Sequence, residues 1–420
     1  MSLSLLPWTR KVLYRHIKLT HHTSYKLFVN LVTSECGAKV APLVHQLEIV
    51  CVRGWPEDVL RNEDRSRAFW LALTGMETLR IGNSPGTEHE LSLLRLSTTR
   101  QLRSLRSFSL RSELGAFASP FDPQVWRNLF VVAPNICAIY IDAQRAYTGT
   151  PVSGDGSKML PLARHIACSV RHFTLTGHLS KAPLEAAKLI NSFEHLTSLE
   201  VIDRHTEGSD TNAVVDRIQQ PRLVELRIQS FGPGRFRLCL RDYFMLNKLL
   251  LDLPIDQRTC PDGLPPSLVH LDIAGRGTPA LLVRIMLSRS TTLPLLRSIA
   301  ASSFAHDPVG RGRVGKQIHR DGTLVLRTDK DGNPMFRPHP DWVVPTFWSS
   351  KDRRQDLENV RAVSCDMGVQ MRGSLLLPLM AVEMWDKELA LCKQLETRWL
   401  DGERFSWEAG AADPEWDNFL

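Results

Sequence analysis

A glycine-rich stretch is the first feature of this 420-residue sequence that could do chemistry. Residues 310–316 read Gly-Arg-Gly-Arg-Val-Gly-Lys, which fits G-x-G-x-x-G and the first seven places of a phosphate-binding loop. Such a loop follows a strand and opens a helix, because its backbone N–H groups must face the phosphate, and its next residue must be Ser or Thr to hold magnesium. Here the next residue is Gln317, and residues 322–333 have the pattern of a β-hairpin. We expect a basic insertion followed by a hairpin, and nucleotide hydrolysis is the last of three functional hypotheses.

Residues that could hold a metal or act as nucleophiles form no complete motif of either kind. The segment 329–333, Asp-Lys-Asp-Gly-Asn, resembles the start of a calcium loop but lacks the distal glutamate at the right spacing. The 8 cysteines are scattered singly without C-x-x-C, and the histidines form no H-x-x-x-H. The nucleophile-elbow pattern G-x-S-x-G occurs once, at residues 82–86, but the residue after its serine is Pro85, which has no backbone N–H to give to an oxyanion hole. We therefore expect no cofactor, no metal site and no catalytic residue, which makes the protein a non-enzyme.

One short pattern recurs along nearly the whole chain and would position all other residues. It is L-x-x-L-x-L, with any aliphatic or aromatic residue at the apolar places, as in Leu196 to Val201 and again in Leu223 to Ile228. A strand with its apolar residues on one side cannot bury that side alone, but parallel copies stacked together form a continuous core, so the pattern predicts a leucine-rich-repeat solenoid. The copies begin at Val44, Met76, Leu105, Ile136, Val170, Leu196, Leu223, Leu246, Leu268, Leu296 and Leu357.

The segments between these strands indicate how the copies are connected. Parallel strands need long crossovers, and capping residues predict helices at residues 125–133, 182–193 and 280–287, with a further helix at 55–74. The expected fold is α/β, a solenoid with a curved parallel sheet on its concave side and helices on its convex side. In five copies a proline lies two residues before the first apolar residue, and it should hold the chain in an extended conformation as it enters the strand. These prolines are Pro42, Pro134, Pro221, Pro266 and Pro294.

Function in such a fold is expected on the concave face. Residues between the apolar places point away from the core, because side chains alternate along a strand. The middle residues of the copies are Glu48, Arg80, Ser109, Tyr140, Thr174, Glu200, Arg227, Leu250, Asp272, Ala300 and Arg361. This surface mixes both charges with few aromatic residues, which suits a protein partner better than a polyanion. The predicted partner-binding residues are Arg80, Tyr140, His172, Glu200, Glu225, Arg227, Lys248, His270 and Asp272.

The N-terminal segment carries a more specific resemblance. Residues 7–19 place a tryptophan, Trp8, before Leu-Tyr-x-x-Ile-x-Leu, and a helix at 25–33 capped by Ser24 follows. This resembles fungal F-box/leucine-rich-repeat proteins at the join between the last F-box helix and the first strand, with the rest of the F-box missing. The resemblance implies a substrate receptor of an SCF-type ubiquitin ligase, which would contact the SCF adaptor subunit through Leu5, Trp8 and Val12. The alternative is a repeat scaffold with no ligase role.

The expected organisation follows from these segments. Residues 1–20 would be the residual F-box-like helix and an entry strand, 21–303 the solenoid and 304–350 the insertion. Residues 351–400 would hold the last repeat and a capping helix, and 401–420 form an acidic tail.

Charge and hydropathy leave several partner classes open. The formal net charge is +7, and residues 91–111 hold five arginines without an acid. Because Phe108 is the single aromatic residue in this stretch, too few to stack successive bases, we interpret it as a solvated helix face and keep nucleic-acid binding as its alternative. No segment has the pattern of a signal peptide or a membrane span, so a cytoplasmic or nuclear location is expected.

Overall fold

The structure is a computed structural model that describes residues 12–50, 63–82, 102–112, 129–143, 169–179, 183–204, 211–231, 236–237, 239–253, 255, 260–273, 279–301, 351–372 and 397. The chain divides into two compact units. The first comprises residues 1–272 with 290–296, and the second comprises residues 273–289 with 297–420. Within the described ranges, no helix is both long enough and apolar enough to span a membrane.

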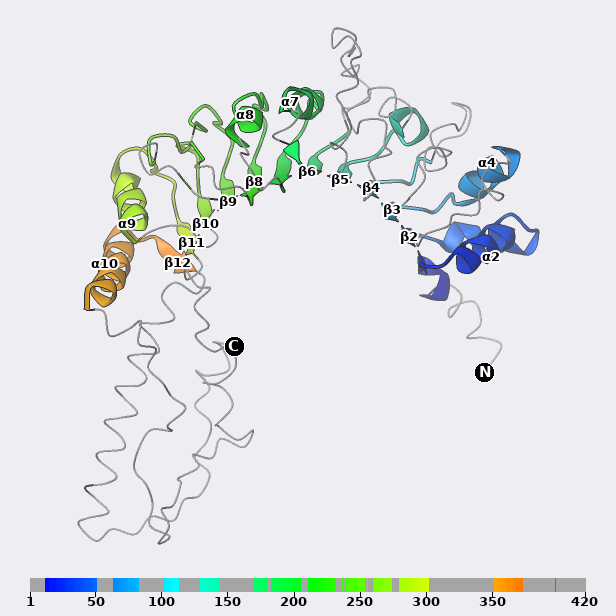
Figure 1. The fold of residues 1–420 in the computed structure, drawn as a ribbon, viewed down its shortest axis with the longest axis horizontal. Coiled ribbons are helices and arrows are strands. Elements are labelled where there is room, and N and C mark those ends of the chain that lie inside the picture. The colour runs from blue at the N-terminus through cyan, green and yellow to red at the C-terminus, as the bar shows by residue number, and fades with distance from the viewer. Residues whose placement is uncertain are drawn as a thin grey trace. The chain divides into compact units, whose positions relative to one another are not determined.

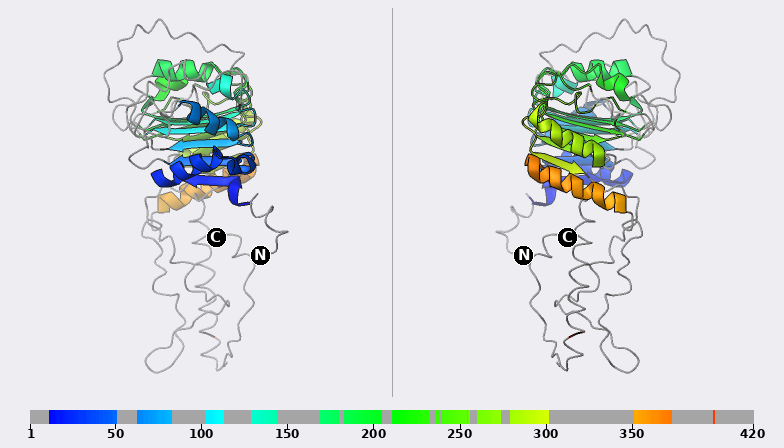
Figure 2. Two further views of the ribbon diagram at one scale, coloured as in Figure 1. Left: turned by 90° about the vertical axis from the view of Figure 1, so that its right-hand side faces the viewer. Right: turned by 90° about the vertical axis from the view of Figure 1, so that its left-hand side faces the viewer.

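Parallel strands that follow one another in chain order form the sheet, as the repeat pattern predicts. From His45 to Asn247, the carbonyl at the second place of each copy accepts two N–H groups of the next copy, as when the His45 carbonyl accepts from Glu77 N at 2.8 Å and Thr78 N at 3.0 Å. The common direction of the strands can be followed in Figure 2. The strands of the first unit are β1 (His16–Leu19), β2 (Gln46–Val50), β3 (Thr78–Gly82), β4 (Ser107–Ser112), β5 (Ala138–Ala143), β6 (His172–Gly177), β7 (Ser198–Asp203), β8 (Glu225–Ser230), β9 (Lys248–Asp252) and β10 (His270–Ile273).

The core of the first unit is built from the apolar places of the repeat. The first residues of the copies from Val44 to Leu296 are at most 1% exposed, and the apolar places that follow are buried in most copies, as with Leu47 and Ile49. Burying each such side chain contributes about 1.5–3 kcal/mol relative to leaving it exposed. The repetition of one buried template therefore accounts for the stacking, and the fold is the predicted α/β leucine-rich-repeat solenoid.

Helices of the first unit lie on one side of its sheet, the outer side of its strands in Figure 1. They are α2 (His22–Val32), α4 (Glu63–Ala72), α7 (Pro183–Asn191) and α8 (Thr211–Val215), with short 3₁₀ turns at Cys36–Lys39 and Ala41–Leu43. In α2 the residues Tyr25, Phe28, Val29 and Val32 are buried, which is the spacing of one helix face. Phe69 of α4 meets Tyr25 and Phe28 edge-on, with ring centroids 6.1 and 6.0 Å apart.

The second unit contains α9 (Pro279–Leu287), a 3₁₀ turn at Ser288–Ser290, β11 (Ser298–Ala301), α10 (Lys351–Met367) and β12 (Gln370–Arg372). α9 packs against α10, and β11 pairs with β12 in parallel. α10 is followed by Gly368, whose φ of +59° lies in the left-handed region that glycine adopts without strain.

Three local predictions are wrong. The copy at Leu357 is helical, because Leu357, Val360 and Ser364 are buried at helical spacing in α10, and an L-x-x-L pair fits a helix as well as a strand. The strand lies instead at β12, so Arg372 and not Arg361 stands opposite Ala300.

The other two errors concern local turns. The prolines before the strands are not in an extended conformation. Pro42 lies in a 3₁₀ turn, and the others lie in turns, namely Pro134, Pro221, Pro266 and Pro294. Proline's fixed φ suits a turn as well as an extended segment. Ser24 is not the N-cap of α2, which is His21, but it contributes to the capping box from the third helical position.

Several predicted features lie outside the described residues. These are the insertion at 304–350, most of the capping helix at 375–399, the acidic tail, and the segment from Leu91 to Arg100. The predicted domain boundaries therefore stay predictions.

Candidate functional site

The side of the first unit's sheet opposite its helices is called the open face below. Along each strand it carries the third, fifth and seventh places of the repeat. The fifth places lie level with one another, because the register pairs Lys18 with Glu48 and continues through each neighbouring strand. The resulting middle row is Lys18, Glu48, Arg80, Ser109, Tyr140, Thr174, Glu200, Arg227 and Leu250. The predicted column of middle residues is confirmed over these strands, and Asp272 follows on β10.

The third places form a second row on the same face. His172, Glu225, Lys248 and His270, which the sequence predicted beside the middle row, all start their strands at this place. The seventh places form a third row, which the six-residue pattern does not include. Its charged or amide members are Arg111, Asp142, Gln229 and Asp252. Continuing the alternation by one more pair of residues would have found them.

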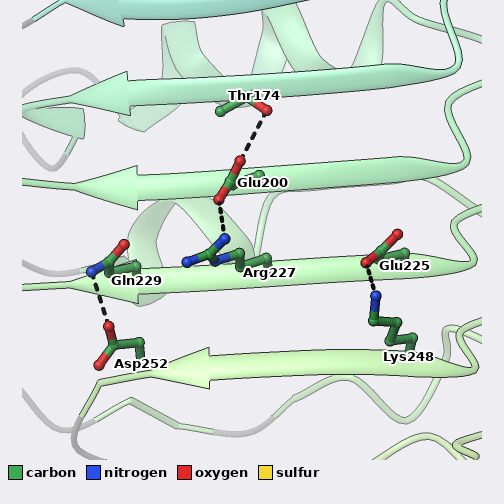
Figure 3. Close-up of polar contacts among 7 residues, drawn as sticks. All are labelled: Thr174, Glu200, Glu225, Arg227, Gln229, Lys248 and Asp252. Carbon is green, nitrogen blue, oxygen red and sulfur yellow. Dashed lines mark hydrogen bonds and ion pairs between the residues drawn. The ribbon is translucent and has the colours of Figure 1, made fainter. Parts of the chain in front are cut away.

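Charged residues on β7, β8 and β9 bond to one another across the strands, as Figure 3 shows. Glu200 lies between two partners: its Oε1 is 3.0 Å from Arg227 Nη1, and its Oε2 accepts a hydrogen bond from Thr174 Oγ1 at 3.1 Å. Lys248 Nζ lies 2.6 Å from Glu225 Oε1. Gln229 Nε2 donates to Asp252 Oδ2 at 2.9 Å. Each of these side chains therefore has a hydrogen-bond or ion-pair partner on a neighbouring strand.

Two further clusters lie on the N-terminal and central strands. Glu48 stands 3.0 Å from Lys18 Nζ and 3.9 Å from His16 Nε2. One Asp142 oxygen lies between Arg111 Nε at 3.6 Å and Arg204 Nη2 at 3.5 Å. Because solvent reaches all of these pairs, each contributes at most about 1 kcal/mol of stability.

Three predicted binding residues differ from this pattern. The side chains of Arg80, Tyr140 and His172 are exposed, and none of these side chains forms a hydrogen bond or ion pair with any residue in the described ranges. Tyr140 is 43% exposed, which is high for an aromatic side chain on a sheet. Only small side chains lie among the three, since Ser109 separates Arg80 from Tyr140 and Ala138 stands opposite His172. A guanidinium, a phenol and an imidazole are therefore available together to an external group.

The pKa of Asp272, on the C-terminal part of the open face, is raised above its ordinary value. Burial raises its pKa, Arg227 and Lys248 lower it, and the nearby Asp252 raises it further. The net direction is upward, because burial together with Asp252 outweighs the two cations.

The predicted adaptor contacts are described only in part. Leu5 and Trp8 lie outside the described residues. Val12 is 57% exposed and its neighbour Leu13 is 69% exposed. Among the described residues, no three His, Cys, Asp or Glu side chains gather closely enough to hold a metal ion.

Comparisons with known proteins give no family assignment. No protein-family model matches the chain, and no characterised protein matches its sequence. Among solved structures, an internalin from Listeria monocytogenes is 11% identical, with 64% of this chain and 78% of that chain covered and a TM-score of 0.34. A Bacteroides fragilis protein is 14% identical, with 68% and 67% covered and a TM-score of 0.29. The fold assignment rests on the chain's own register and buried repeat.

Proposed function

We propose that the protein is a non-catalytic protein-binding module that holds its partner against the open face. The observation that carries the proposal is the group formed by Arg80, Tyr140 and His172. On a face where most other charges are already bonded to neighbouring strands, the side chains of these three residues are exposed and have no bonded partner in the described part of the chain.

The chemistry of the three residues supports protein recognition. Tyrosine and arginine are enriched among the residues that dominate binding energy at protein interfaces. Both present rigid, planar groups that lose little conformational freedom when a partner covers them. The bonded pairs beside them fix the surrounding side chains, so less ordering remains to be done on binding.

Site-specific photo-crosslinking in cells tests this proposal. A photoreactive phenylalanine analogue in place of Tyr140 is expected to capture a discrete partner, which mass spectrometry then identifies. The matched control carries the same group at Leu27, which is 63% exposed on α2 and lies on the helix side. The product at position 140 should disappear when Arg80→Ala and His172→Ala are added. Equal products from both positions, or a product at 140 that survives those changes, would show that the open face is not the binding surface.

A second function, substrate recognition for an SCF-type ubiquitin ligase, is proposed because apolar side chains are exposed next to β1. Val12 and Leu13 are exposed at the segment that resembles the end of an F-box. Apolar residues exposed side by side often mark contacts with another protein. A ligase role of this kind would place the protein in the cytoplasm or nucleus.

Co-purification with the SCF adaptor subunit separates this function from a plain interaction scaffold. The full chain should retain the adaptor, and the triple variant Leu5→Ala, Trp8→Ala, Val12→Ala should lose it. Substitution is preferable to deletion here, because β1 begins at His16 and must be kept intact. If the folded wild-type chain does not retain the adaptor, the scaffold function remains and the ligase role is excluded.

A further inference from the structure

The charges of the open face are unevenly distributed along the first unit. On β1 to β4 the face carries the cations Lys18, Arg80 and Arg111 and one carboxylate, Glu48. On β7 to β10 the balance is reversed, with four carboxylates, Glu200, Glu225, Asp252 and Asp272, and two cations, Arg227 and Lys248. The face is therefore positive at its N-terminal strands and negative at its C-terminal strands.

Bonding within the sheet sharpens this difference. At the positive end Lys18 is paired with Glu48 and Arg111 with Asp142 of β5, which leaves Arg80 as the cation whose side chain has no partner in the described residues. At the negative end Arg227 is bonded to Glu200 and Lys248 to Glu225. Asp252 accepts a hydrogen bond from the neutral amide of Gln229, and neither Asp252 nor the half-buried Asp272 forms an ion pair within the described ranges.

The strands between the two ends are different in character. Open-face residues of β5 and β6 include Ala138, Tyr140 and Thr174, and their ladder neighbour Ser109 is also small. Tyr140 is the exposed aromatic group of this region. The carboxylate of β5, Asp142, is already held by Arg111 and Arg204, so the face around Tyr140 is small and partly apolar between the positive and negative ends.

We propose that the partner is a protein segment with separated charges, which lies across the strands with its acidic part over β1 to β4, an apolar or aromatic side chain at Tyr140, and its basic part over β9 and β10. This inference rests on the proposed function and adds the chemistry of the partner. Complementary charges fix the orientation of the segment and speed its association, while Tyr140 supplies apolar contact area.

The spacing of the strands sets the length of the segment. Seven strand-to-strand steps separate β3 from β10, which at about 4.8 Å per step amounts to roughly 34 Å. An extended chain covers this distance with about ten residues. The acidic and basic groups of the partner should therefore be about ten residues apart, with the apolar side chain between them.

Selection from a random peptide library tests the inference. The probe is a library of 16-residue peptides displayed on phage and selected at low ionic strength against the immobilised full chain. Enriched sequences should hold acidic residues at one end, basic residues at the other and an aromatic or large aliphatic residue between them. Dissociation constants of the synthetic peptides are then measured against protein variants and against peptides of the same composition with alternating charges.

Substitutions at the two ends give separate readouts. Arg80→Glu, and the double variant Asp252→Asn with Asp272→Asn, should each weaken binding at least fivefold, and alternating-charge peptides should bind at least fivefold more weakly than segregated ones. The control Lys26→Glu makes the same kind of charge reversal at an exposed position of α2 and should change affinity less than twofold. All variants must unfold as cooperatively as the wild type.

The possible failures can be told apart. Peptides that need Tyr140 but carry mixed charges, or acids alone, would overturn the inference and leave the proposed function standing. If no enriched peptide loses affinity for the Tyr140→Ala variant, the open face is not a binding surface, and both proposals fall.

Discussion

Arg80 and Tyr140 lie at the same level of the open face, two strands apart, with only the small side chain of Ser109 between them. At the usual spacing of strands their Cα atoms are about 10 Å apart. A single side chain of a partner can contact both the guanidinium and the phenol, because Ser109 does not fill the space between them. The repeat brings these two residues together although they are distant in the sequence.

The Glu200–Arg227 pair is expected to contribute little to stability. Its two side chains are 25% and 46% exposed, so water screens their attraction. A double-mutant cycle with Glu200→Gln and Arg227→Met, followed by urea denaturation, should give a coupling free energy of about 0.5 kcal/mol. A coupling above about 2 kcal/mol would mean that the pair is part of the framework and not a solvated surface feature.

Gly75 is expected to tolerate no side chain. A Cβ at this position would lie 2.1 Å from the Pro42 carbonyl oxygen of the preceding copy, and backbone cannot easily move away. Gly75→Ala should lower the free energy of unfolding by about 1–3 kcal/mol, the usual effect of overpacking. Gly82→Ala is the matched control, because its nearest atom would be 3.9 Å away. Equal effects of the two substitutions in urea denaturation would show that this close approach does not exist.

Asp203 is expected to be the most sensitive polar residue of the core. It is fully buried, its Oδ1 accepts from the backbone N–H of Leu179 at 3.2 Å, and its Oδ2 accepts from Thr211 Oγ1 at 3.4 Å. Asp203→Ala removes the acceptor of the Leu179 N–H, while Thr211 Oγ1 keeps Ser230 Oγ at 3.1 Å, and should cost about 1–3 kcal/mol of unfolding free energy. Asp203→Asn keeps an acceptor oxygen and should cost less than half as much. Thermal unfolding of both variants measures the difference, and a harmless Asp203→Ala would contradict the hydrogen bonds described.

The buried phenol of Tyr243 should make the folded protein less stable at high pH. Its hydroxyl donates to the Ile218 carbonyl at 2.7 Å, and burial, followed by the charge of Asp216, raises its pKa from the ordinary 10.0 to about 12. Because the folded state favours the protonated phenol, the resulting stabilisation is complete below pH 10 and is lost as the pH rises from 10 to 12.

The Tyr243→Phe variant isolates this effect from other titrations. Wild type should be more stable than Tyr243→Phe by about 1 kcal/mol at pH 9, the usual value of one hydrogen bond. Between pH 9 and about 11.5 the difference should shift by about 2 kcal/mol in favour of the variant. Urea denaturation at the two pH values measures it, and a constant difference would show that the phenol is not buried in the folded state.

The sequence alone predicted most of the first unit, because one template both defines the core and orients the open face. Once the apolar places of copies such as Leu223 to Ile228 are aligned, the strand register follows, and with it the neighbours of Glu200 and Arg227. The sequence-based prediction failed in the last copy for a physical reason. L-x-x-L fits a helix as well as a strand, so Leu357 was misassigned, while β12 lacks the apolar triplet altogether.

Bonding between side chains could not be predicted in the same way. The nine predicted binding residues look alike in the sequence, yet Glu200, Glu225, Arg227 and Lys248 are bonded to one another, whereas Arg80, Tyr140 and His172 have no such partner in the described ranges. Which charges meet depends on rotamers and on the row beyond the template, where Asp142 and Asp252 lie. Whether these residues bind a partner stays a prediction.

The affinity of the partner captured at position 140 tests the central claim most directly. It is measured by calorimetry for the wild type, for Arg80→Ala with Tyr140→Ala and His172→Ala, and for the helix-side control Lys26→Ala with Leu27→Ala. Removing exposed arginine and tyrosine anchors should weaken binding at least thirtyfold, which is about 2 kcal/mol, and the control should stay within twofold. Equal affinity of the triple variant and the wild type, or a loss confined to the control, would contradict binding at the open face.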